Sequence, residues 1–320
     1  MKYNKTTKQW HKALPFTLLS LSLFAAAVLT GCEREETEPL PSPVVSSPLA
    51  SKVFAYLPAP GQFVNDGYTC RTMDEACRYA EERLAQTAHV SLGGFGGYIV
   101  VGFDHRVMND GDYDLAVTGN AFHNSSEPGI VWVMQDSNGN GLPDDTWYEL
   151  RGSEYGKEGT WADYAVTYYR PEKPQQPVRW TDNRGQSGEV DYLTAYHHQD
   201  FYYPLWIEAD SLTLCGTRLA ARNRDLSGSG VSWVNEDFEW GYADNYSPTD
   251  MLSEKTRDNH FRISDAVCAD GSTANLPYID FVKIQTATNA KSGWLGENST
   301  EILAVKDYHM EKGGGLSLEK

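Results

Sequence analysis

The sequence predicts a mainly β fold, an antiparallel β-sandwich of the jelly-roll type with one short N-terminal helix. Most of the chain consists of short runs rich in Val, Ile, Tyr, Phe and Trp, which Gly, Pro, Asn and Asp interrupt. Only one segment has a firm helical pattern, and no repeat of the propeller or solenoid type is visible. Many short strands with turn signals and a single helix are typical of an antiparallel sandwich.

The predicted helix begins at Thr72. Thr72 and Glu75 have the spacing of a capping box, in which each side chain binds a free backbone N–H at the helix start. The apolar residues that follow recur at helical spacing, so they form one face directed at the core. These residues are Met73, Ala76, Cys77, Ala80 and Leu84.

The predicted strands are short and lie between turn-forming residues. Their ranges are 98–103, 113–118, 129–134, 146–150, 164–169, 212–219, 238–242, 261–267, 279–285 and 301–306. The stretch 92–98, which reads L-G-G-F-G-G-Y, stands before the first of them. It lacks the G-x-G-x-x-G spacing and the lysine of phosphate-binding loops. Its glycines therefore favour a bulged, closely packed start of the strand.

The N-terminus has the three parts of a bacterial lipoprotein signal. Lysines within residues 2–12 precede an apolar run at 14–29, which ends in L-T-G-C at Cys32. This order matches a lipobox, so residues 1–31 are predicted to be a signal peptide and Cys32 to carry the lipid. The alternative is an ordinary secretory signal followed by a chance cysteine. The acidic run at 33–36 resembles the export signal that directs lipoproteins of Bacteroidota to the outer face of the outer membrane.

The composition after the signal predicts a tether, one domain and a tail. Residues 32–50 are predicted to be the lipidated Cys and a flexible tether, because 37–50 are rich in Pro and Ser. We expect residues 51–310 to form the β-sandwich ligand-binding domain and residues 311–320 to be a disordered tail. The formal net charge is −17, so nucleic acid is not an expected partner, because its phosphates would be repelled.

A candidate metal site lies in the segment 136–145, which reads D-S-N-G-N-G-L-P-D-D. Ca²⁺ takes about six to eight oxygen ligands, and alternate residues of a tight loop can point their oxygens inward. The segment departs from an EF-hand, because Trp147 stands where a bidentate Glu belongs and both flanks read as strands. We predict a structural Ca²⁺ ion in a loop between two strands; a plain turn without metal is the alternative. The predicted ligands are Asp136, Asn138, Asn140, Asp144 and Asp145.

A second acidic cluster lies in N-D-G-D-Y-D at 109–114. If a strand begins at Tyr113, Asp112 and Asp114 point to the same face. A second Ca²⁺ site there would use Asp110, Asp112, Asp114 and Glu127. The alternative is a solvated Asp-Gly turn.

Four cysteines remain when Cys32 is set aside. An even number in an exported protein allows two disulfides with three possible connectivities, and buried free thiols are the alternative. No C-x-x-C pair exists, so the sequence supports neither a zinc knuckle nor a redox motif. These cysteines are Cys70, Cys77, Cys215 and Cys268.

The sequence contains no motif that identifies an enzyme. The H-E-x-x-H and G-x-S-x-G patterns are absent. Acidic pairs for glycoside hydrolysis remain possible, because the spacing that matters is spatial. Aromatic rings among Gly, Asn and Asp in the second half of the chain can stack on a sugar or a large planar ligand, or can fill the core. The candidate ligand-binding residues are Trp206, Trp233, Trp240, Tyr242 and Trp294, with Tyr246 beside them.

Several long stretches resemble a family of surface lipoproteins from Bacteroidota described only as cell surface proteins. The stretches lie at 92–104, 109–122, 126–131, 136–150, 279–286 and 293–302. The resemblance implies a jelly roll related to carbohydrate-binding folds. It also implies a role near outer-membrane cobalamin (vitamin B12) uptake systems, in which a corrinoid is captured for a TonB-dependent transporter. The family offers no catalytic residues.

These observations together lead us to expect a lipid-anchored outer-membrane protein that faces the cell exterior and captures a ligand without turnover. Cobalamin or a related corrinoid is the first expected ligand, and a glycan is the second. Two other functions remain open. The first is an adhesin or scaffold that contacts another surface protein, and the second is a glycan-cleaving enzyme.

Overall fold

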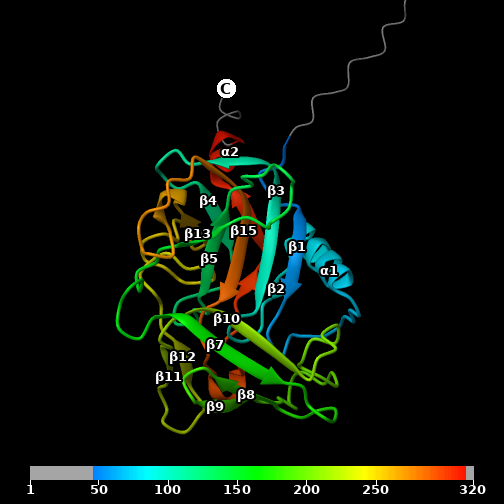
Figure 1. Ribbon diagram of the computed structural model, residues 1–320. Coiled ribbons are helices and arrows are strands. Elements are labelled where there is room, and N and C mark those ends of the chain that lie inside the picture. The colour runs from blue at the N-terminus through cyan, green and yellow to red at the C-terminus, as the bar shows by residue number, and fades with distance from the viewer. Residues whose placement is uncertain (1–45, 315–320) are drawn as a thin grey trace, which may run out of the picture. The chain divides into compact units, whose positions relative to one another are not determined.

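The computed structural model describes residues 46–314 (Figure 1). The predicted signal peptide, the lipidated Cys32 and most of the predicted tether lie outside the described residues. The described part is mainly β, with antiparallel sheets and few helices, as the sequence predicts. None of its helices is long and apolar enough to cross a lipid bilayer.

The largest sheet has six antiparallel strands. Its order is β1 (Lys52–Leu57), β3 (Tyr98–Met108), β15 (Tyr278–Thr286), β5 (Gly129–Met134), β6 (Trp147–Leu150) and β14 (Ala266–Val267). The register places Val282 of β15 opposite Val101 of β3 on one side and Val133 of β5 on the other. All three valines are buried, so the centre of this sheet carries a row of β-branched side chains that suit a strand.

A three-stranded sheet shares its core with the largest sheet. It consists of β13 (Asp258–Phe261), β4 (Leu115–Thr118) and β17 (Ala304–Asp307), in that order. Val117 and Val305 of this sheet belong to the same apolar cluster as Val101 and Val282. Helix α1 (Met73–Ala85) adds Leu84 to that cluster. One hydrophobic core therefore joins both sheets and the helix.

A four-stranded sheet has a separate, tyrosine-rich core. Its strands are β10 (Ser211–Arg218), β7 (Trp161–Tyr169), β8 (Val178–Asp182) and β9 (Ser187–Val190), and Figure 1 shows them grouped together below β3 and β15. Tyr164, Tyr168, Tyr202 and Tyr203 are buried there. The Gln285 amide donates to the carbonyls of Gly96 and Cys215 at 2.9 Å, which fixes the end of β15 to β10.

Two small antiparallel pairs complete the β structure. Strand β11 (Asn223–Asp225) pairs with β12 (Trp233–Asn235). Strand β16 (Glu301–Ile302) pairs with β2 (Val90–Ser91). Both pairs contribute residues to the cavity described below.

Helix α1 follows the sequence prediction closely. The Thr72 hydroxyl accepts the N–H of Glu75 at 3.2 Å, and Ala76, Cys77, Ala80 and Leu84 are buried. The other helical turns are η1 (Ile263–Asp265), η2 (Gly293–Leu295) and α2 (Tyr308–Gly314). Helix α2 runs beyond residue 310, so the segment 311–314 is helical where a disordered tail was predicted; the rest of that tail lies outside the described residues.

The predicted strands at 98–103, 129–134, 146–150, 164–169, 212–219 and 279–285 are confirmed as β3, β5, β6, β7, β10 and β15. The prediction at 113–118 is confirmed only from Leu115 onward. Those at 261–267 and 301–306 are each divided between two shorter strands. Strands β1, β2, β8, β9, β11 and β12 were not predicted. The runs of β2, β8, β9, β11 and β12 are short or polar, whereas β1 is a mostly apolar run of six residues that the prediction missed.

The prediction of a strand at 238–242 is wrong. The Asn245 side chain accepts the N–H of Phe238 and donates to its carbonyl, both at 2.8 Å. The Asp250 carboxylate accepts the N–H of Gly241. Side chains therefore take the hydrogen bonds that a neighbouring strand would otherwise make, and the segment forms a loop.

The glycine-rich stretch at 92–98 is a closely packed approach to β3, as predicted. Gly93 has φ +67°, and a Cβ atom there would lie 2.0 Å from the carbonyl oxygen of Ala59. Only glycine fits this backbone conformation and this contact.

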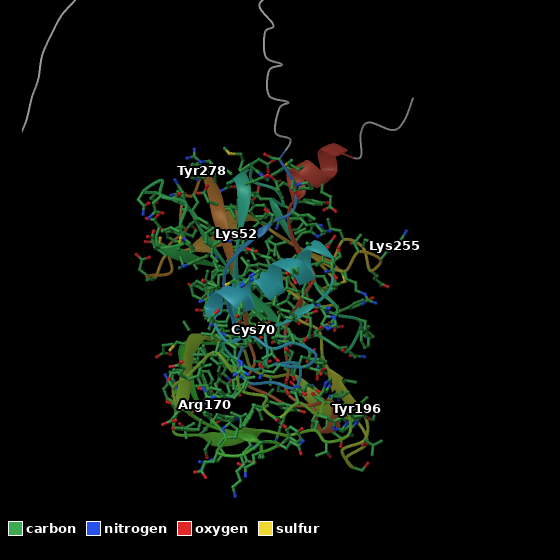
Figure 2. The ribbon with its side chains drawn as sticks, turned by 90° about the vertical axis from the view of Figure 1, so that its right-hand side faces the viewer. Lys52, Cys70, Arg170, Tyr196, Lys255 and Tyr278 are labelled. Carbon is green, nitrogen blue, oxygen red and sulfur yellow. The ribbon has the colours of Figure 1, made fainter. Side chains whose placement is uncertain are left out.

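The cysteines within residues 46–314 are free thiols, so neither of the two disulfides that the sequence allowed is present there. Cys77 lies on the buried face of α1, and Cys70 is buried next to that helix, where Figure 2 labels it. Burial raises the pKa of Cys70 to about 11 and also raises the pKa of Cys77. Cys215 is exposed and Cys268 is half-buried.

Candidate functional site

An open cavity of about 350 Å³ lies where loops from many parts of the chain meet. Its floor and polar walls come from the loops after β4 and after η2, the end of β12 and the start of β16. Its rim comes from the loop after β1, the loop after β9 and the η2 turn. The lining residues are Gln62, Phe63, His89, Asn120, Ser125, Glu127, Tyr196, Asn235, Ser292, Trp294, Leu295, Gly296, Glu297, Ser299 and Glu301.

Three carboxylates gather at the floor of the cavity. Glu127, Asp244 and Glu301 each place an oxygen within 4.8 Å of the other two. Asp244 and Glu301 are buried, whereas Glu127 is half-buried. We call these three residues the acidic floor. They form one of two groups of side chains in the described chain with the composition and spacing to hold a metal ion.

Asp244 is fixed in place by backbone donors. One of its oxygens accepts the N–H groups of Asn120 and Ala121 at 2.8 and 2.9 Å. The other accepts the N–H of Glu301 at 2.8 Å. Gly119 allows this wrapping, because a Cβ atom there would lie 2.5 Å from Asp244 Oδ1. The sequence folds this way because the loop after β4 supplies consecutive N–H groups to a single carboxylate.

The two glutamates of the acidic floor are less fully bonded. Glu127 Oε1 accepts the N–H of Ser299 at 3.2 Å, and Glu301 Oε2 accepts from the Asn120 amide at 3.4 Å. Glu301 Oε1 has no hydrogen-bond partner among the described residues. Glu297, on the cavity wall, accepts the N–H of Gln62 at 2.7 Å through its Oε1.

Burial changes the acidity of this cavity. It raises the pKa of Glu127 to about 8, with the neighbouring Asp244 charge adding to the effect. It raises the pKa of Asp244 and of Glu297 to about 7, and that of Glu301 well above its usual range. Within residues 46–314, no Lys, Arg or His nitrogen lies within 4.0 Å of these carboxylates. These carboxylates therefore have no basic partner at ion-pair distance within the described residues, although the charge of Arg257 acts to lower the pKa of Asp244.

The rim of the cavity is aromatic. Trp294 is 48% exposed and Tyr196 is 60% exposed, and their ring centroids are 6.2 Å apart. The indole N–H of Trp294 donates to the carbonyl of Val231 at 3.0 Å, which holds the ring in place. Tyr196 projects at the surface (Figure 2). Half-buried Phe63 completes the rim. Open rings beside hydrogen-bond acceptors suit a ligand with both apolar and polar faces.

Of the predicted ligand-binding aromatics, only Trp294 lines this cavity. Trp206 packs in the core against Tyr56 at 6.2 Å between centroids. Tyr242 is also buried, and its hydroxyl accepts the N–H of Glu154. Trp233 is half-buried behind the η2 turn and donates to the carbonyl of Gly230 at 3.1 Å. Two further residues, Trp240 and Tyr246, line a different hollow.

The predicted Ca²⁺ loop joins β5 to β6, and its candidate ligands lie together. Asp136 accepts the N–H groups of Gly139 and Gly141 at 2.7 and 2.9 Å. The amides of Asn138 and Asn140 donate to the carboxylate of Asp144 at 3.0 to 3.2 Å. Asp145 accepts the N–H of Ser137 at 3.0 Å. The loop thus gathers the predicted oxygens, some of which also bind its own backbone.

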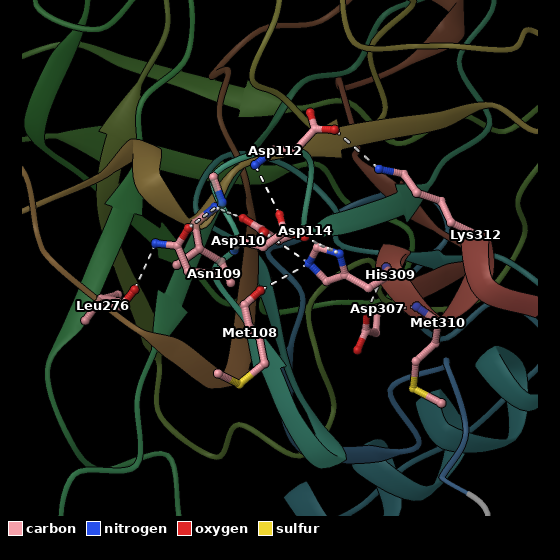
Figure 3. Close-up of polar contacts among 12 residues, drawn as sticks. Met108, Asn109, Asp110, Asp112, Asp114, Leu276, Asp307, His309, Met310 and Lys312 are labelled. Carbon is pink, nitrogen blue, oxygen red and sulfur yellow. Dashed lines mark hydrogen bonds and ion pairs between the residues drawn. The ribbon is translucent and has the colours of Figure 1, made fainter.

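The predicted second acidic site is divided between two places. Asp110 and Asp114 lie on either side of His309, with 3.1 Å from Nδ1 to Asp110 and 3.1 Å from Nε2 to Asp114 (Figure 3). Asp112 is exposed and lies 3.5 Å from the Lys312 ammonium. Glu127 belongs to the acidic floor instead. Asp110, Asp114 and His309 form the second group with the composition and spacing to hold a metal ion, so part of the predicted set lies together. Because β4 begins at Leu115, strand alternation does not apply to Asp112 and Asp114.

Sequence reasoning missed three acidic residues of the cavity: Asp244, Glu297 and Glu301. Glu301 lies within one of the long stretches that carry the family resemblance, and so does Glu297. Their position in that stretch was the only sequence feature that could have marked Glu297 and Glu301 as functional candidates. Asp244 gave no such signal, because it follows the predicted strand at 238–242 and lies in none of the stretches that carry the resemblance.

No protein-family model matches this chain, and no curated protein matches it either.

Proposed function

We propose that this protein is a lipid-anchored ligand-capture module of the outer-membrane surface, and that its ligand binds in the cavity with the acidic floor. The observation that carries the proposal is the combination of exposed rings at the rim with oxygen acceptors below them. A cavity of about 350 Å³ falls within the range of small-molecule sites, which combine apolar walls with a few convergent polar groups. The lipobox at Cys32 supports the surface anchor.

A corrinoid is the first ligand that we propose, following the family resemblance of the sequence. It is too large for this cavity to enclose, so we expect it to rest against Trp294 and Tyr196. Its peripheral amides can then donate hydrogen bonds to Glu127 and Glu297. Delivery to a TonB-dependent transporter is the corresponding role.

A glycan is the second ligand, and the floor of the cavity favours it. Sugar hydroxyls donate hydrogen bonds to carboxylates, and the apolar face of a sugar ring stacks on an exposed indole. Glu127, Glu297 and Glu301 offer the acceptors, and Trp294 offers the ring.

Two finer structural proposals accompany this function. The sheets that share the main core belong to a jelly roll, as the strand pattern of the sequence suggests. The loop of Asp136, Asn138, Asn140, Asp144 and Asp145 holds a structural Ca²⁺ ion. Its all-oxygen donor set suits that ion.

Titration calorimetry of cyanocobalamin, and then of a glycan panel, into the mature protein tests the function. We expect saturable binding by one of these ligands without turnover. Trp294→Ala should weaken that binding about tenfold or more, because an aromatic anchor is removed. Tyr155→Ala is the matched control, since Tyr155 is exposed but lies outside the cavity.

The other outcomes separate the remaining functions. Shortened glycans in the reaction mixture, lost in Glu127→Gln, would identify an enzyme instead of a binding module. Absence of binding by both ligand classes would refute the capture proposal and leave protein contact as the function.

A further inference from the structure

We propose that the acidic floor is a divalent-cation site, with Glu127, Asp244 and Glu301 as protein ligands and Ca²⁺ as the ion. This inference does not depend on which ligand enters the cavity. It also concerns a different place in the fold from the loop at 136–145.

The first argument is a buried acceptor with nothing bound to it. Glu301 is 3% exposed, and its Oε1 has no donor within hydrogen-bond distance in the part of the chain that the structure describes. Leaving a buried acceptor unsatisfied costs about 1–3 kcal/mol, and more when it is charged. Glu301 is one of the residues that line the cavity.

The second argument is the charge of the cluster. Like charges less than 5 Å apart repel strongly when solvent is limited, and the three floor carboxylates lie within 4.8 Å of one another. No Lys, Arg or His nitrogen from residues 46–314 lies within ion-pair distance of them, and the more distant Arg257 offsets only part of this charge, since the pKa of Asp244 remains raised. A divalent cation would offset this repulsion and would also bind the free oxygen of Glu301.

The third argument is the capacity of the other two carboxylates to bind a cation. Asp244 Oδ2 accepts a single N–H, that of Glu301, so it keeps a lone pair for an ion. Glu127 Oε1 likewise accepts a single N–H, from Ser299. The backbone donors that hold Asp244 position its carboxylate before any ion arrives, which lowers the entropy lost on binding.

The donor set identifies the kind of ion. All of the floor ligands are oxygens, which excludes the nitrogen and sulfur donors typical of zinc sites. Mg²⁺ usually binds through one or two carboxylates and keeps several waters, whereas Ca²⁺ accepts more carboxylates in flexible geometry. Three carboxylates at one point therefore favour Ca²⁺, with the cavity side left open for water or for oxygens of a bound ligand.

The test measures Ca²⁺ bound by the chelator-treated full-length chain, using calorimetric titration and elemental analysis. We expect Glu301→Gln to bind one Ca²⁺ ion fewer per chain than the unmodified protein. Glu149→Gln is the matched control, because Glu149 is a buried glutamate outside the acidic floor, and it should bind the same number as the unmodified protein. Mg²⁺ should bind more weakly than Ca²⁺.

Unchanged stoichiometry in Glu301→Gln, or no Ca²⁺ bound by the unmodified protein, would overturn the inference. If Glu301→Gln does not fold, Glu127→Gln is measured in its place and is held to the same result. A negative result for Ca²⁺ binding leaves the capture proposal intact, since that proposal is tested by the effect of Trp294→Ala on ligand binding.

Discussion

The carboxylate of Asp244 accepts the backbone N–H of Glu301 at 2.8 Å, so one acidic residue of the cavity floor holds the chain segment that carries another. The same carboxylate holds Asn120 and Ala121 through its second oxygen. Three segments that are distant in sequence therefore meet at a single side chain. This makes Asp244 both a structural centre of the cavity and one of its candidate metal ligands.

Asp244→Ala should destabilise the protein by about 3–5 kcal/mol, because it leaves three buried N–H groups without an acceptor. The stability of Asp244→Asn should lie between those of Asp244→Ala and the unmodified protein, since an amide keeps one acceptor oxygen. Denaturant unfolding in the presence of chelator measures both values without any contribution from metal. Equal stability of Asp244→Ala and the unmodified protein would contradict this account of the cavity.

Stability should fall as pH rises from about 4.5 to about 7, partly because of Glu149. Burial raises the pKa of Glu149 to about 7 from an ordinary 4.5, although a hydrogen bond from Thr217 opposes the shift. The folded protein therefore binds more protons than the unfolded chain in this window, and its stability decreases with pH there. Glu149→Gln removes this titration, so the variant should lose about 3 kcal/mol less stability than the unmodified protein over this pH range. Denaturation curves at several pH values compare the two proteins; parallel curves would argue against the assignment.

Gly93→Ala should prevent folding or lower stability by several kcal/mol, since a Cβ atom would meet the Ala59 carbonyl at 2.0 Å. Gly185→Ala is the control for backbone conformation alone. Gly185 also has positive φ, at +81°, but nothing lies within 4 Å of a Cβ atom there. Gly185→Ala should lower the free energy of unfolding by only about 1–2 kcal/mol. Similar melting temperatures for the two variants would show that close packing at Gly93 is not the cause.

Calcium should raise the melting temperature of the chelator-treated protein by about 5–10 °C at concentrations well above the dissociation constant. Asp144→Asn should reduce this increase, because it removes a charge from the proposed loop site while keeping acceptors for Asn138 and Asn140. Differential scanning calorimetry with and without Ca²⁺ provides the comparison. An equal Ca²⁺-dependent increase in the melting temperature of Asp144→Asn would show that the loop does not bind the ion.

Local patterns in the sequence were sufficient for the elements whose stability is local. The capping box at Thr72 and the apolar spacing up to Leu84 predicted α1, and the unbroken apolar run at 129–134 predicted β5. The segment 238–242 has three aromatic residues, which favoured a strand, but it is a loop because Asn245 and Asp250 bind its backbone. Hydrogen bonds from later side chains do not appear in a local pattern.

The candidate site was only partly accessible from the sequence for the same reason. Glu127 and Trp294 were identified as functional candidates, but Glu127 was grouped with the wrong partners. Its true neighbour Asp244 is brought close because Gly129 and Ala243 exchange backbone hydrogen bonds at 2.9 Å. This contact joins two loops far apart in the chain, and neither composition nor periodicity specifies it.

The order of the cavity residues along the chain has a consequence for biosynthesis. The rim begins at Gln62, whereas the last residue of the acidic floor is Glu301. Because synthesis proceeds from the N-terminus, a growing chain carries the Gln62 side of the wall long before Glu301 exists. An incomplete or unfolded precursor therefore has no floor, and it acquires the capacity to bind ligand or ion only when β16 has docked onto β2.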